Sequence, residues 1–245
     1  MNDVPLHELA SASASAYDQS SPQNFERVAD LSSPDISTYR RDNAFIVAHR
    51  GTDLKASDIT KQLKADSAIL FGNRAQNELH KKRTKETERI VSSIKSQHPD
   101  STIHLTGHSL GGSTAMHSLI KSKVVRDNVD ALHTFNAGSS PFQHKGMSPT
   151  NKAYKQIEAK STHHSVRGDE ISRSIGDSLI GKKVVYSPGK KKHTITSTVL
   201  DLASRYLKTH NNPLSKLAHF AVGKLGNTLS AHSLDNFMTS KLEYA

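Results

Sequence analysis

The chain contains no cysteine and no tryptophan, and aromatic residues make up only 5% of its 245 positions. Without cysteine it can form no disulfide, no thiolate nucleophile and no cysteine-ligated metal site, which fits a reducing compartment such as the cytoplasm. With so few aromatic side chains, a stacking platform for nucleic acid is not expected. The chemistry of the protein must therefore rest on other residue types.

Long hydrophobic runs are missing as well. The longest apolar stretches, such as residues 44–48, are far too short to span a bilayer. The chain begins Met-Asn-Asp-Val, with neither the basic region nor the apolar region of a signal peptide. We expect a soluble protein with no signal peptide and no transmembrane segment.

Acidic residues are outnumbered: 33 lysines and arginines stand against 23 aspartates and glutamates, for a formal net charge of +10. The basic residues cluster at Lys81–Arg83 and Lys190–His193, and no aromatic residue is interleaved with either cluster. The simplest explanation of such a charge is solubility. Among partners, it favours peripheral contact with an anionic membrane surface or an acidic protein over nucleic acid.

The segment around which the rest is organised is Thr106–Gly112, which reads Thr-Gly-His-Ser-Leu-Gly-Gly. It follows the apolar run Ile103–Leu105 and opens a stretch with helical spacing. A strand, a Gly-x-Ser-x-Gly turn and a helix are what a nucleophile elbow requires, and Gly107 and Gly111 lack the Cβ atoms that would clash across so sharp a turn. Ser109 is the predicted nucleophile; the alternative is a glycine-rich turn that only lets two elements pack closely.

Strand-like and helix-like patterns alternate around this motif. We expect helices over residues 5–18 and 74–97, a β-hairpin from residues 36–40 and 44–49, strands at 129–135 and 159–166, and a short strand and turn at 183–189. Residues 139–157 look irregular. The alternation predicts an α/β fold with a mostly parallel central sheet flanked by helices.

The domain organisation follows from the same patterns. Residues 1–34 are expected to form an N-terminal helical and polar extension, and residues 35–245 the main domain. Two amphipathic segments predict a helical insertion at about residues 195–226, either packed as a hairpin or in contact with a membrane or partner. The partly apolar residues 53–72 are a candidate lid or a fixed surface helix.

The strand at residues 44–49 runs directly into Arg50, Gly51 and Thr52. Gly51 allows a tight exit from the strand, which would leave backbone N–H groups free to point at a ligand oxygen. An ordinary turn that ends a strand is the alternative interpretation.

A serine nucleophile needs a base, and the base needs an orienting acid; in α/β-hydrolases the chain order is serine, acid, histidine. Asp169 fits the acid because it follows the predicted strand at 159–166 and a glycine. The adjacent Glu170 would point the opposite way on an extended chain. Asp177 and Asp201 are alternatives, although Asp201 lies within a helical segment.

Four histidines come late enough to be the base: His193, His210, His219 and His232. His193 lies in a lysine run, where neighbouring cations oppose protonation. His210 ends a predicted helix and His219 lies inside one. His232 follows the last long helix in Ser-Ala-His-Ser-Leu, so its context suits a loop that folds back over the serine.

Four segments together resemble class 3, fungal-type lipases. They are Ala48–Thr52, the Thr106–Gly112 elbow, the Gly168–Ile171 turn and the late His232–Phe237 segment. The resemblance covers roughly residues 35–175 and the His232 tail. The Arg-Gly-Thr loop, about one βα unit before the elbow, is its more discriminating feature. His49 stands where the family commonly has an apolar aromatic residue, and the lid region lacks tryptophan.

The resemblance implies an α/β-hydrolase that cleaves carboxylic esters of lipids, acylglycerols or phospholipids, without a metal or organic cofactor. Ser109 would be the nucleophile, Asp169 the orienting acid and His232 the base. Thr52 and the backbone N–H of Leu110 would form the oxyanion hole.

Two other functions fit the sequence less well. One is an inactive hydrolase fold that acts as a basic membrane- or partner-binding module. The other is a peptidase or thioesterase that uses the same triad.

Overall fold

The computed structural model describes residues 4–51, 74–138, 147–169, 179–187 and 233–238. In these residues the chain forms one mixed sheet with the strand order β1-β2-β3-β4-β5-β6-β7. The strands are β1 (Glu26–Arg27), β2 (Ile36–Arg41), β3 (Ala44–His49), β4 (Thr102–His108), β5 (Ala131–Phe135), β6 (Ser161–Val166) and β7 (Lys182–Tyr186). The first three strands pair antiparallel, and the pairs from β3 to β7 are parallel. The predicted α/β architecture with a mostly parallel sheet is confirmed.

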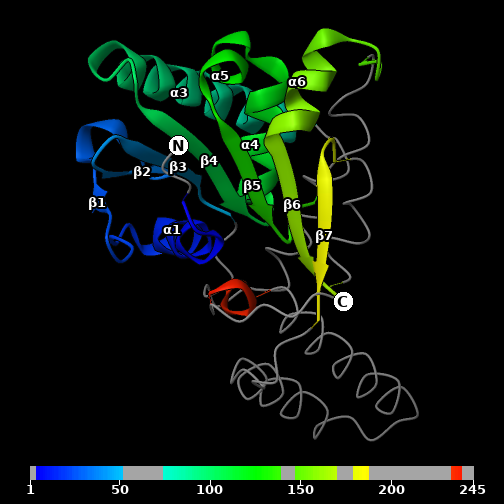
Figure 1. Ribbon diagram of the computed structural model, residues 1–245, viewed down its shortest axis with the longest axis horizontal. Coiled ribbons are helices and arrows are strands. Elements are labelled where there is room, and N and C mark those ends of the chain that lie inside the picture. The colour runs from blue at the N-terminus through cyan, green and yellow to red at the C-terminus, as the bar shows by residue number, and fades with distance from the viewer. Residues whose placement is uncertain (1–3, 52–73, 139–146, 170–178, 188–232, 239–245) are drawn as a thin grey trace, which may run out of the picture.

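Helices cover both faces of the sheet (Figure 1). One face carries α1 (Leu6–Asp18) and the 3-10 turn η2 (Leu234–Phe237), which is red in Figure 1. The other face carries α3 (Arg74–Gln97), α4 (Leu110–Lys121), α5 (Lys123–Asn128) and α6 (Lys152–Lys160). A further 3-10 turn, η1 (Ala29–Leu31), precedes β2. No helix in the described ranges has both the length and the hydropathy needed to cross a membrane.

The two faces of β3 show how the sequence sorts side chains. Successive residues of a strand point to opposite faces. Phe45 and Val47 therefore pack with α3 and α4, whereas Ala44, Ile46 and Ala48 pack with the alanine-rich α1. His49 lies on the same face of the strand as Phe45 and Val47, so its imidazole is placed between the sheet and α3.

Several expected elements match the structure closely. The helix over 74–97, the hairpin from 36–40 and 44–49 and the N-terminal helix are confirmed. Asp42, in the hairpin turn, has a φ of 50°, which is the left-handed conformation that its turn position favours. The candidate lid at 53–72 and the helical insertion at 195–226 lie outside the described residues.

The prediction of an irregular segment at 139–157 is wrong for its last part. Residues 152–160 form α6, and the next strand begins at Ser161 rather than at Ala159. The helix begins at an N-cap, where the Asn151 side chain accepts a hydrogen bond from the N–H of Ala153. Its apolar stripe is short, because Ile157 is its only buried residue. Such a stripe is too weak for the hydrophobic period to reveal it.

Candidate active site

Ser109 lies at the junction between β4 and α4, in a strained backbone conformation with φ 54° and ψ −125°. Residues other than glycine rarely adopt positive φ, and when they do they are held by their surroundings. Here the Ser109 N–H donates to the carbonyl of Phe135, at the end of the neighbouring strand β5, over 3.0 Å. The geometry is that of a nucleophile elbow.

The two glycines of the motif are required by close packing. A Cβ on Gly107 would lie 2.5 Å from the carbonyl carbon of Gly111. A Cβ on Gly111 would lie 2.9 Å from both the carbonyl carbon of Arg50 and the nitrogen of Gly51. Real Cβ contacts do not come this close, so the elbow presses directly on the end of β3.

Leu110 is the first residue of α4 and is buried, at 8% exposure. N–H groups in the first turn of a helix have no acceptor within the helix, and they carry the positive end of its dipole. The Leu110 N–H therefore belongs to a set of donors suited to a negatively charged oxygen beside Ser109.

Asp169 lies at the same edge of the sheet, after β6. It is 2% exposed, and its N–H donates to the carbonyl of Val166 over 3.1 Å. Gly168, just before it, has a φ of 92° that turns the chain at the strand end. Asn136, after β5, joins these ends: its N–H donates to the carbonyl of His164, and its Oδ1 accepts from the N–H of Val166. Serine and carboxylate thus follow strands separated only by β5.

Other predicted site residues lie outside the described residues. These are Thr52, His232, the alternative bases His193, His210 and His219, and the alternative acids Glu170, Asp177 and Asp201. The structure therefore brings together Ser109, Leu110, Asp169 and the β3 end at Arg50 and Gly51. Among the described residues, no group of three or more histidine, aspartate or glutamate side chains could hold a metal ion.

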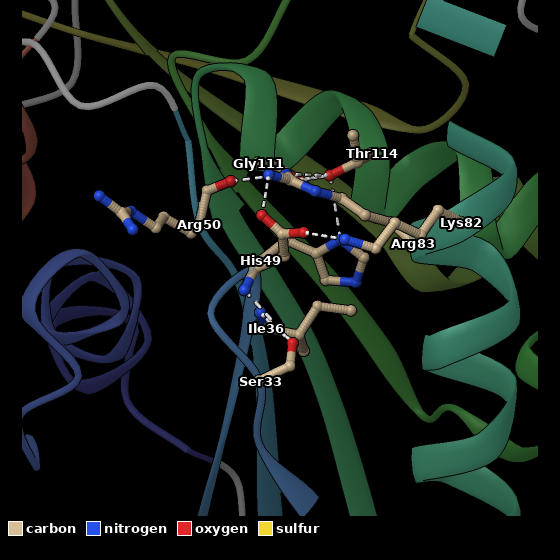
Figure 2. A network of polar contacts seen from close by, with 9 residues as sticks. Ser33, Ile36, His49, Arg50, Lys82, Arg83, Gly111 and Thr114 are labelled. Carbon is tan, nitrogen blue, oxygen red and sulfur yellow. Dashed lines mark hydrogen bonds and ion pairs between the residues drawn. The ribbon is translucent and has the colours of Figure 1, made fainter. Parts of the chain in front are cut away.

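A polar network that was not predicted holds the end of β3 from the α3 side. Figure 2 shows Arg83 reaching from α3 to the end of β3, with Thr114 and His49 beside it. Arg83 Nη1 donates to the carbonyl of Arg50 over 2.6 Å and to Thr114 Oγ1 over 3.2 Å, and Nη2 pairs with Asp35 Oδ1 over 3.2 Å. The hydrophobic pattern gave no sign of it, because Arg83 stood in an apparent surface cluster of basic residues.

His49 fills the space beside this guanidinium. Its Nδ1 lies 3.0 Å from Thr114 Oγ1 and its Nε2 lies 3.1 Å from Thr87 Oγ1. Burial, reinforced by the Arg83 cation, lowers the pKa of His49 well below its usual value. His49 is therefore a neutral, hydrogen-bonded residue at the position where class 3 lipases commonly have an aromatic one.

On the opposite face of the sheet, α1 reaches the elbow. Tyr17 Oη lies 2.9 Å from His108 Nδ1, the residue just before Ser109. Ser13 Oγ lies 2.9 Å from Thr106 Oγ1, at the start of the motif. These contacts were also not predicted from the sequence.

Buried histidines extend away from the site along β5 and β6. His164 Nε2 lies 3.0 Å from His133 Nδ1, and His164 Nδ1 lies 2.9 Å from Tyr186 Oη. Burial lowers the pKa of His164 to about 3 and that of His163 to about 4. Between α3 and α4, burial also lowers the pKa of His80 to about 3.

The mixed sheet and its serine elbow define the α/β-hydrolase fold. Residues 46–141 match the family model described as Lipase (class 3), which confirms the resemblance found in the sequence. The match includes the β3 end and the elbow.

Solved lipases are among the structures similar to this chain. Lipase II from Rhizopus niveus is 16% identical with a TM-score of 0.50, over 74% of this chain and 78% of that one. Lip2 lipase from Yarrowia lipolytica is 16% identical with a TM-score of 0.47, over 74% and 77% of the two chains. The lipase from Rhizopus microsporus var. chinensis is 17% identical with a TM-score of 0.45, over 74% and 72%. A comparison with curated proteins gives no significant match.

Proposed function

We propose that this protein is a serine hydrolase that cleaves carboxylic esters of lipids, either acylglycerols or phospholipids. The observation that carries the proposal is the strained backbone of Ser109, at the tip of an elbow whose two glycines have no room for a side chain. Strain of this kind persists only where the surrounding structure holds it, and it clusters at active sites.

Each catalytic role has a candidate residue. His232 takes the proton from Ser109 Oγ as that oxygen attacks the ester carbonyl, and Asp169 orients the imidazole and stabilises its charged form. The N–H of Leu110 and Thr52 stabilise the oxyanion of the tetrahedral intermediate. A donor of this kind is worth about 3 kcal/mol in comparable sites.

The remaining steps follow from proton balance. His232 returns its proton to the leaving alcohol, and the carbon–oxygen bond to that alcohol breaks to leave an acyl-enzyme on Ser109. Water then attacks the acyl group with His232 as base, which releases the fatty acid and restores the serine. No step needs a metal or an organic cofactor.

Three observations support a serine hydrolase that acts on lipid esters. Residues 46–141 match the class 3 lipase family model, and the solved neighbour with a TM-score of 0.50, from Rhizopus niveus, is a lipase. Asp169 is buried at the strand end where this fold keeps its acid. The net charge of +10 favours anionic interfaces such as phospholipid surfaces.

A panel of p-nitrophenyl esters of increasing chain length, run beside phospholipid vesicles and triacylglycerol emulsions, tests the proposal. The wild type should hydrolyse lipid esters and Ser109→Ala should not. Ser96→Ala, a substitution at an exposed serine on α3, serves as the matched control and should keep full activity.

Other results of the panel would point elsewhere. Vesicle binding without hydrolysis of any ester would favour an inactive binding module. Cleavage of peptides or thioesters in preference to esters would favour the other hydrolase classes. Unchanged ester cleavage by Ser109→Ala would overturn the proposal.

A further inference from the structure

Arg83 is a buried cation without a catalytic role in the mechanism above. Its side chain is 6% exposed, and its guanidinium lies between α3, the end of β3 and the first turns of α4. A buried charge is costly unless it is paired and hydrogen-bonded. Retaining a buried charge here requires strong compensating contacts, and two of them reach the end of β3 and the first turns of α4, beside the candidate active site.

Arg83 and Asp35 together hydrogen-bond both backbone polar groups of Arg50, its carbonyl and its N–H. The Arg50 carbonyl accepts from Arg83 Nη1, and the Arg50 N–H donates to the Asp35 carbonyl over 2.9 Å. The Asp35 carboxylate closes the ring by pairing with Arg83 Nη2. The backbone of Arg50 is thus held on two sides by two residues that also form an ion pair with each other.

Asp35 is itself well oriented for this purpose. Ser33 Oγ accepts hydrogen bonds from the N–H groups of Asp35 and Ile36, which fixes the turn before β2. Burial alone would raise the pKa of the Asp35 carboxyl, but Arg83 and Lys82 lower it to a value below the usual one. Asp35 is therefore a fixed anion opposite the guanidinium.

The same guanidinium also reaches the nucleophile elbow. Nη1 of Arg83 donates to Thr114 Oγ1, which in turn donates to the carbonyl of Gly111 over 3.0 Å. Gly111 is the glycine that packs against the peptide between Arg50 and Gly51. Arg83 therefore bridges the elbow and the β3 end at the place where they touch.

We propose that Arg83, oriented by Asp35, is a positioning residue that fixes the β3 end against the nucleophile elbow and so sets the geometry of the oxyanion hole. The inference rests on the proposed function, because Thr52, the proposed oxyanion donor, directly follows Gly51 in the sequence. Arginine suits the role because its planar fork reaches three acceptors at once, whereas lysine is a single charged point. Mispositioning by about 1 Å can cost 10²-fold in rate.

Amide hydrogen exchange, followed by mass spectrometry on peptides that cover residues 44–51 and 107–114, tests the bridge without relying on activity. Arg83→Lys and Arg83→Met should both speed exchange in these peptides. Lys82→Met is the matched control: Lys82 also pairs with Asp35 but is 69% exposed. In Lys82→Met, exchange in both peptides should equal that of the wild type. Equal exchange in all four proteins would overturn the bridge.

Steady-state kinetics on a short soluble ester, expressed per folded protein, test the effect on catalysis. We expect kcat to fall about 10- to 100-fold in Arg83→Lys, with KM within about 2-fold of the wild type, because a misplaced oxyanion donor weakens only transition-state binding. Lys82→Met should keep its kcat. An Arg83→Lys variant with reduced thermal stability and unchanged kcat would show that Arg83 is only structural, and would overturn the inference.

Thr114 provides a second route if the Arg83 variants fold poorly. Thr114→Val removes the hydroxyl that joins Arg83 to Gly111, and Thr114→Ser keeps it. We expect a lower kcat in Thr114→Val and recovery in Thr114→Ser; equal values would contradict the bridge. A wild type that cleaves no ester, with Ser109→Ala equally inactive, would defeat the proposed function, and hydrogen exchange alone would then decide whether Arg83 holds the β3 end.

Discussion

Tyr17 Oη lies 2.9 Å from Nδ1 of His108, and this contact joins the last turn of α1 to the residue before Ser109. The same hydroxyl borders the β3 end, because a side chain on Gly51 would collide with it. α1 thus supports the elbow on one face of the sheet while Arg83 supports it on the other. The N-terminal helix is part of the scaffold of the site.

Tyr17→Phe tests this support. Removing the hydroxyl takes one partner from the buried His108, so the free energy of unfolding should fall by about 1 kcal/mol. Urea denaturation followed by circular dichroism measures it. Tyr154→Phe is the control, because no described residue hydrogen-bonds the Tyr154 hydroxyl; its effect should be below about 0.5 kcal/mol. Equal effects at the two tyrosines would contradict the role given to Tyr17.

Gly111→Ala should be the most damaging glycine substitution in the elbow. The added methyl would overlap the backbone of His49 and Arg50, which cannot move without displacing β3. We expect a loss of about 2 kcal/mol or more in stability, together with loss of activity. Gly168→Ala isolates backbone strain, since its φ is 92° but no atom lies within 4 Å of the new methyl. It should cost about 1 kcal/mol. The reverse order of the two losses would refute the packing argument.

The buried histidines predict a stability that depends on pH. In the folded protein burial lowers the pKa of His164 to about 3, while the unfolded chain takes up a proton near pH 6.5. Between these values the unfolded state binds more protons, so stability is complete above pH 6.5 and falls as the pH drops toward 3. Each such histidine contributes a slope of about 1 kcal/mol per pH unit in this window.

His164→Gln should flatten that slope by the contribution of one histidine, whatever it does to stability at neutral pH. Urea denaturation at intervals between pH 4 and pH 7 gives the slope for each protein. A variant whose slope equals that of the wild type would show that His164 is not held neutral by burial.

The acid and base have separable tests. Asp169→Asn should lower kcat by up to about 10⁴-fold without a large change in KM, because the orienting acid acts on the base rather than on substrate binding. Among the four late histidines, only His232→Ala should lose activity to the same degree, while alanine at positions 193, 210 and 219 should leave it intact. Full activity in His232→Ala would refute that assignment.

The parts of this fold that the sequence reveals are those with strong local patterns. Residues 74–97 carry an apolar seam with helical spacing, and the elbow combines an apolar run with two glycines, so both were predictable. The candidate nucleophile was predicted from the Gly-x-Ser-x-Gly motif, and the candidate acid from chain order. Their surroundings did not, because the contacts of Arg83 and Tyr17 join residues 31 to 91 positions apart. Spacing along a sequence carries no information about such pairs.

Arg83 also shows that a run of basic residues does not reveal which of its members is buried. Within Lys-Lys-Arg it has the appearance of a solvated charge, yet helical geometry turns it inward while Lys81 and Lys82 stay exposed. The helix α6 was missed for a related reason: its cap and its single buried isoleucine are weaker signals than a full apolar stripe. Both errors come from contacts that only the folded chain creates.

The most direct test of the central claim is the site of reaction with a fluorophosphonate probe. After labelling of the native protein, peptide mass spectrometry should find one adduct, on Ser109, because only an activated hydroxyl attacks such a probe at neutral pH. Labelling should vanish in Ser109→Ala and persist in Ser96→Ala. A folded wild type that takes up no probe, or that carries it on another residue, would contradict the account.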